Sequence, residues 1–102
     1  MVAESMRTMS NTPLSERDYE RIAAALAAPR RLQILKEIGA SNGPYACTAI
    51  IQSQHISAAT VSHHIKELER AGLIEVSREG KFLNLVLRRD VLRTYADYLA
   101  AI

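Results

Sequence analysis

The sequence predicts a single, mainly α-helical domain with one small β-hairpin near its carboxyl end. Apolar residues recur at helical spacing over most of residues 13–72 and again over 90–102. In residues 73–87, apolar and polar residues alternate on both sides of a glycine, as in a β-hairpin. A chain of 102 residues, 48% hydrophobic and 24% charged, has the composition of a small globular domain. Because so short a chain is near the lower limit for an independent core, association with a second copy would stabilise it.

Residues 1–12 are polar and lack periodicity, so we expect a disordered tail followed by one domain over residues 13–102. The lone cysteine, Cys47, excludes an internal disulfide. We find no secretion signal and no apolar run long enough for a membrane, and therefore expect a soluble cytoplasmic protein without a membrane partner. The net charge of +2 is too small to identify a partner.

The first helix has two competing start signals. Thr12 followed by Pro13 offers one N-cap, and Ser15 with Asp18 offers a second one turn later; we expect a helix over residues 13–27. Pro29 then ends this helix and begins the next. The buried side of the second helix is expected to comprise Leu32, Leu35 and Ile38.

The central motif is a short helix over residues 47–54 followed closely by a second helix over residues 57–72. Ser57 can cap the start of the second helix and Gly72 can end it. Val61, Ile65 and Leu68 recur at helical spacing and form one apolar stripe along this helix. The opposite face carries small residues first and basic ones later, namely Ala59, Thr60, Ser62, His63, Lys66 and Arg70. This order suits a recognition helix whose first turns approach base edges, so the pair is a helix-turn-helix candidate.

Residues 73–78 and 81–87 form the predicted hairpin around Glu79 and Gly80, with Arg78 and Lys81 at its tip. Asp90 is the expected N-cap of a last helix. We expect this helix to pack against the first helix and against a second chain. The predicted dimerisation residues are Tyr19, Ile22, Leu26, Leu92, Tyr95, Leu99 and Ile102.

Two segments, LAAPRRLQILKEI and ISAATVSHHIKELERAGLIEVSREGKFLNLVL, resemble the ArsR/SmtB family of bacterial transcriptional repressors. The resemblance implies a winged helix-turn-helix with terminal dimerisation helices, in the order α-α-α-α-β-β-α. It also implies a homodimer that represses transcription from a palindromic operator in double-stranded DNA and releases it when an effector binds. By position, the implied DNA contacts are Arg30, Arg31, Ser57, Ala59, Thr60, Ser62, His63, Lys66, Arg78 and Lys81.

The effector is not identified by these residues. Metal-sensing members often carry a Cys-x-Cys pair where this chain has Ala46 and Thr48, and Asp90 and Asp97 on the last helix are accompanied by no histidine. We therefore predict no metal site and no cofactor, with a non-standard metal-responsive site as an alternative. Cys47 is best explained as a small, partly buried hydrophobe, and the alternative is a thiol or redox sensor.

The residues disfavour two other classes of function, an enzyme and a protein-binding module. An enzyme is not expected, because Cys47 and the histidines lack a third catalytic group, an oxyanion element and a phosphate loop. A protein-binding winged helix should show an acidic or apolar recognition face, whereas this face carries His63, Lys66 and Arg70.

Overall fold

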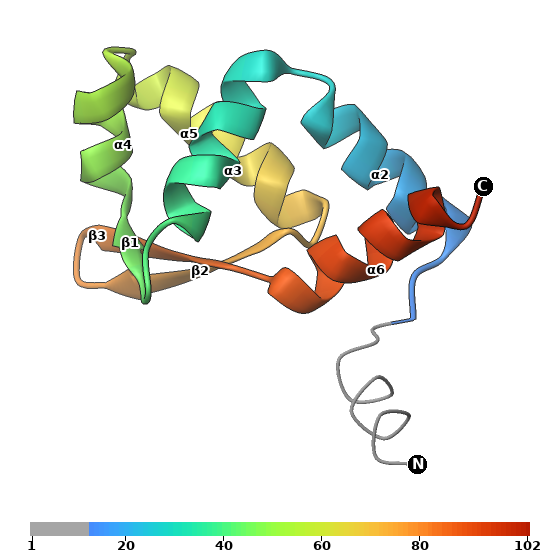
Figure 1. Cartoon of the computed structure of the whole chain (residues 1–102). Coiled ribbons are helices and arrows are strands. Elements are labelled where there is room, and N and C mark those ends of the chain that lie inside the picture. The colour runs from blue at the N-terminus through green and yellow to red at the C-terminus, as the bar shows by residue number, and fades with distance from the viewer. Residues whose placement is uncertain (1–12) are drawn as a thin grey trace.

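The computed structural model describes residues 13–102, so the predicted tail over residues 1–12 lies outside the described part. Figure 1 shows helices that cover one face of a small antiparallel sheet. The helices are α2 (Glu16–Leu26), α3 (Pro29–Gly39), α4 (Cys47–Gln54), α5 (Ala58–Arg70) and α6 (Arg89–Ala100). The strands are β1 (Tyr45–Ala46), β2 (Ile74–Glu79) and β3 (Phe82–Leu87). The predicted mainly helical winged helix-turn-helix is confirmed.

The sheet has the order β1-β3-β2, with both neighbouring pairs antiparallel. Glu79 pairs with Phe82, so Gly80 and Lys81 form a two-residue turn in which Gly80 has a φ of 63°. The hairpin was predicted one residue too early, around Glu79 and Gly80. Strand β1 was not predicted, because two residues that pair with Leu85 and Asn84 leave no alternating pattern in the sequence.

The structure decides between the two start signals of the first helix. The Ser15 hydroxyl accepts a hydrogen bond from the Asp18 N–H at 3.1 Å, and the Asp18 carboxylate accepts one from the Ser15 N–H at 2.9 Å. This reciprocal capping box starts α2 at Glu16, so the predicted start at residue 13 is wrong. The predicted Asp90 cap is also wrong, because α6 begins at Arg89 with Arg88 as its N-cap.

The core lies between the sheet and the helices. Its fully buried side chains come from every helix except α6 and from the sheet region: Ile22, Ile34, Ile38, Ile50, Val61, Leu68, Leu73 and Leu85. In α3 the buried side comprises Ile34, Leu35 and Ile38, whereas Leu32 is 36% exposed, contrary to the prediction. The reason is that α3 packs against α2, α4, α5 and β3 together. The positions of these four neighbours decide which side of α3 is buried, and the spacing of its apolar residues does not show where they lie.

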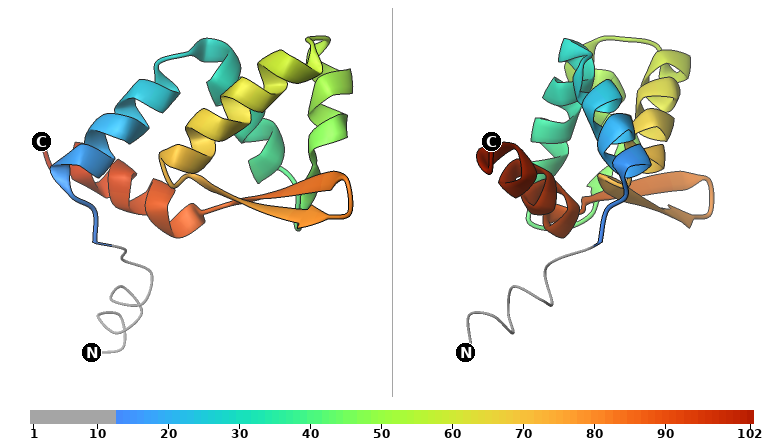
Figure 2. Two further views of the ribbon diagram at one scale, coloured as in Figure 1. Left: turned by 180° about the vertical axis from the view of Figure 1, so that it is seen from behind. Right: turned by 90° about the vertical axis from the view of Figure 1, so that its right-hand side faces the viewer.

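The two ends of the molecule differ in character. The amino end of α2 meets the carboxyl end of α6 at one end of the molecule, while α4 and the hairpin tip lie at the other (Figures 1 and 2). Helix α5 runs through the middle and connects these regions. Among the described helices, none combines the length and the apolar composition that crossing a membrane requires.

Candidate DNA-binding interface

Helix α5 buries one side and presents the other to solvent. Val61 and Leu68 are 0% exposed and Ile65 is 3% exposed, as the apolar stripe predicts. The exposed residues include every residue of this segment that the sequence places at DNA, namely Ser57, Ala59, Thr60, Ser62, His63 and Lys66. An exposed helix face with short side chains in its first turns suits a close approach to base edges in a major groove.

The amino end of α5 is fixed by its own hydroxyl groups. Ser57 accepts a hydrogen bond from the Thr60 N–H at 3.1 Å and donates its hydroxyl proton to Thr60 Oγ1 at 2.9 Å. His55, the residue that turns the chain between α4 and α5, adopts a left-handed backbone with a φ of 55°. Ser57 therefore acts as the helix cap and orients Thr60 on the exposed face.

The hairpin tip carries exposed basic side chains. Arg78 and Lys81 are both exposed, and the tip projects at the end where α4 lies (Figure 1). The Lys81 Nζ lies 6.0 Å from the centre of the Phe82 ring, which is 57% exposed. Sequence reasoning did not select Phe82 as an interface candidate, although an aromatic residue directly after a hairpin turn was the available signal.

The two arginines at the start of α3 differ in their surroundings. Arg30 is exposed and donates from Nη1 to the Gln54 carbonyl at 3.0 Å and to Gln54 Oε1 at 3.1 Å, so it lies beside the end of α4. Arg31 is half-buried and donates from Nε to Nδ1 of His64 at 3.3 Å. Of the two, only Arg30 is brought to the exposed surface beside α4.

A carboxylate network holds α4 in place behind this surface. Glu37 of α3 accepts hydrogen bonds from the Tyr45 hydroxyl at 2.5 Å, from the Ser53 hydroxyl at 2.7 and 2.8 Å, and from Gln54 Nε2 at 3.1 Å. Burial raises the pKa of Glu37, but the hydrogen bonds from Tyr45, Ser53 and Gln54 outweigh it and hold the pKa below its ordinary value. No pattern in the sequence predicts this cluster, because its members come from α3, β1 and α4.

Known proteins share this arrangement. Residues 26–77 match the profile of a helix-turn-helix domain family. An uncharacterised HTH-type transcriptional regulator from Methanocaldococcus jannaschii is 37% identical over 65 residues, which are 61% of this chain and 72% of that protein. The HTH-type transcriptional regulator NmtR of Mycobacterium tuberculosis is 31% identical over 78 residues, which are 74% of this chain and 63% of that protein.

A solved structure agrees in fold and sequence. It is the homodimeric winged helix-turn-helix DNA-binding domain of a possible ArsR-family transcriptional regulator from Mycobacterium bovis, with 30% identity and a TM-score of 0.67. The alignment covers 88% of this chain and 88% of that one. The chain belongs to the ArsR family. It is thus a transcriptional regulator with a winged helix-turn-helix DNA-binding fold, and not an enzyme, as the sequence predicts.

The end formed by α2 and α6 carries exposed apolar surface. The rings of Tyr19 and Tyr98 stack with their centres 3.9 Å apart, and the ring centres of Tyr95 and Tyr19 are 6.2 Å apart. Tyr98 is 51% exposed and Leu99 is 46% exposed. Ile102, at the last position of the chain, is also exposed. Exposed apolar side chains that gather at one end of a domain are typical of an interaction surface.

Two groups of predicted dimerisation residues behave differently. Leu26, Leu92 and Tyr95 are partly buried against the core of their own chain and keep some exposed area. Ile22 is 0% exposed within the single chain, so it has no surface to offer a second one. The prediction of Ile22 as a contact residue is therefore corrected: its place on the apolar face of α2 is explained by the core.

Cys47 is the first residue of α4 and packs, half-buried, against the core. Burial raises the pKa of its thiol, which favours the protonated and less reactive form. In this ArsR-family chain, residues 13–102 contain no cluster of three or more His, Cys, Asp or Glu side chains arranged to hold a metal ion. Asp90 is engaged by the Arg88 guanidinium at 2.8 and 3.0 Å.

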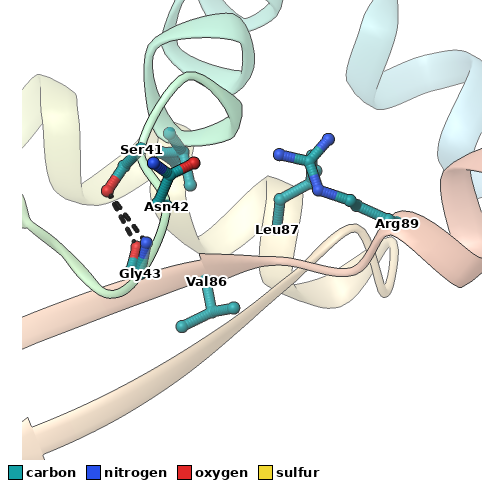
Figure 3. A pocket seen from close by; sticks show the side chains of 7 residues that line it. Ser41, Asn42, Gly43, Val86, Leu87 and Arg89 are labelled. Atoms are coloured by element: carbon teal, nitrogen blue, oxygen red, sulfur yellow. Dashed lines mark hydrogen bonds between the residues drawn. The ribbon is translucent and has the colours of Figure 1, made fainter.

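A small pocket lies away from α5, between the loop after α3 and the junction of β3 with α6. Figure 3 shows Arg89 reaching toward this loop, where Ser41 bonds to Gly43. The pocket measures about 200 Å³, and the guanidinium of Arg89 donates to the Gly39 carbonyl at 2.6 Å. This volume is below the usual range for a small-molecule site, and its only charged lining group already has a partner.

Proposed function

We propose that this chain is a repressor that binds, as a homodimer, to a palindromic operator and leaves it when an effector binds. One observation carries the proposal: the exposed, small and polar face of α5 lies in the same domain as a basic hairpin tip, and both are free of the core. An α-helix with short residues in its first turns reads base edges, and a basic tip contacts the backbone beside them.

The proposed base contacts come from Ala59, Thr60, Ser62 and His63, next to the cap residue Ser57. Lys66, Arg78, Lys81 and Arg30 are assigned to the phosphate backbone, because they are exposed and their long side chains suit charge contacts. Arg31 was also predicted at a phosphate, but the hydrogen bonds of its guanidinium to His64 and to the Ala25 carbonyl favour a role in holding helices together.

The homodimer is supported by the exposed apolar surface of α2 and α6 and by the homodimeric Mycobacterium bovis relative. A two-fold dimer would place two copies of α5 in successive major grooves, so half-sites should lie about one DNA turn, or 34–36 Å, apart. The dimer also adds buried area that a domain of this size lacks.

Selection from random double-stranded DNA tests the proposal directly. We expect recovery of an imperfect palindrome and binding with a steep salt dependence. Lys66→Ala and Lys81→Ala should each weaken binding to every sequence and reduce the slope of log affinity against log salt by about 0.9. Ser62→Ala and His63→Ala should instead change the selected sequence.

The same experiment separates the competing functions. Recovery of no palindromic site, with unchanged salt slopes in both lysine variants, would contradict operator binding and favour the protein-binding winged helix. The metal-responsive alternative predicts that zinc, nickel or cobalt changes operator affinity, whereas we expect no such change. The repressor role itself is tested with a reporter gene placed downstream of the selected site.

A further inference from the structure

Arg31 joins three helices through one guanidinium group. It lies on α3, donates from Nη1 to the Ala25 carbonyl at 3.3 Å and the Ala24 carbonyl at 3.5 Å, and donates from Nε to His64 on α5. The carbonyls belong to the last turn of α2, which has no basic residue of its own. Arg31 thus supplies the cation that favours this helix end and ties it to the recognition helix.

His64 is turned away from the exposed face that its neighbour His63 occupies. His64 is half-buried and its ring centre lies 5.9 Å from that of His63, which is exposed. The Nδ1 atom of His64 can accept the Arg31 Nε–H only when it carries no proton. In the imidazolium form, an N–H would face an N–H and two positive charges would lie in contact.

The surroundings of His64 favour the neutral ring. Burial, followed by the charges of Arg31, His63 and Arg30, lowers the pKa of His64 below its ordinary value. The carboxyl-terminal half of α2, which faces this site with the carbonyls of Ala24 and Ala25, has the uncharged sequence IAAAL. Helix α4, with the sequence CTAIIQSQ, brings no acidic or basic side chain.

We propose that Arg31 and His64 are positioning residues that hold recognition helix α5 against dimerisation helix α2, and that protonation of His64 weakens operator binding. The inference rests on the proposed function, because it concerns how the two copies of α5 are presented to DNA. Correct half-site spacing requires a fixed relation between the helix that forms the dimer and the helix that enters the groove. The Arg31 guanidinium provides a direct link between them.

The first test compares wild type with His64→Asn, whose side-chain oxygen can accept from Arg31 near the position of Nδ1 but cannot be protonated. As the pH falls from about 7.5 through the lowered pKa of His64, wild type should lose up to roughly tenfold in operator affinity relative to the variant, the worth of one charged hydrogen bond. His55→Asn, at the exposed left-handed position, is the matched control and should respond to pH like wild type. An equal acid response in wild type and His64→Asn would overturn the proposal.

The second test distinguishes positioning from phosphate contact. Arg31→Gln should reduce operator affinity roughly tenfold without changing the salt slope, whereas loss of a phosphate contact would lower that slope by about 0.9. In the DNA-free protein, the NMR titration of His64 should move to higher pH in Arg31→Gln, because the charge of Arg31 contributes to the lowered pKa of His64. An unchanged His64 titration would overturn only this inference, whereas failure of wild type to bind any DNA site would overturn the proposed function as well.

Discussion

Replacing Glu37 with Gln should destabilise the domain by loosening α4. The two carboxylate oxygens accept from Tyr45, Ser53 and Gln54, which belong to β1 and to the end of α4. Glutamine has the same shape, but one of its terminal groups is an NH₂ that cannot accept. At least one donor of the network therefore loses its acceptor, and the remaining bonds lose the negative charge.

The expected cost is about 1–2 kcal/mol, the lower part of the range for charged hydrogen bonds, because Ser53 is exposed and water can replace part of its bond. For a domain of this size, such a loss lowers the melting temperature by roughly 5–10 °C. Thermal and urea unfolding should be compared at one protein concentration, since a dimer's stability depends on it.

The pH dependence gives the prediction a second signature. Because the pKa of Glu37 is lower in the folded protein than its ordinary value of 4.5, its contribution is fully present above that value. Stability is then lost as the pH falls through the lower, folded pKa. Glu37→Gln should lack this part of the acid loss, while Glu69→Gln, which changes an exposed glutamate of α5, should retain it.

This account of the network would be refuted if Glu37→Gln had the melting temperature of wild type and lost the same amount of stability at acid pH. A loss equal to that of Glu69→Gln would show instead that removal of any glutamate charge has the same effect. The urea m-value should remain constant, because the variant changes stability and not the extent of folded structure.

Three further changes test other parts of the structure. Gly72→Ala should cost about 1–2 kcal/mol in unfolding free energy, because its φ of 78° disfavours a side chain, whereas Gly43→Ala, which also meets open space, should cost less. Leu99→Glu should weaken dimerisation at least about tenfold in sedimentation experiments, and an unchanged dimer would move the interface elsewhere. Cys47→Ser and wild type should respond equally to peroxide in operator binding; a response confined to wild type would make Cys47 the sensor.

Much of the fold is determined by local patterns. The stripe of Val61, Ile65 and Leu68, with Ser57 and Gly72 at the ends, predicts α5 almost to the residue, because period, cap and stop signal agree. The hairpin is predicted for the same reason, although its turn lies one residue later. Where two local signals compete, as at Pro13 and Ser15, the sequence alone does not choose, and the reciprocal bonds of the capping box decide.

The sequence by itself determines the order of the helices and the hairpin, the outer face of α5 and the family to which the chain belongs, because these depend on residue type and spacing along one segment. Tertiary structure alone decides contacts between distant segments. It assigns Ile22 to the core, pairs β1 with β3, gathers donors around Glu37 and places Arg31 between α2 and His64. Periodicity shows which side of a helix is buried, but the neighbour that buries it is set by packing in three dimensions.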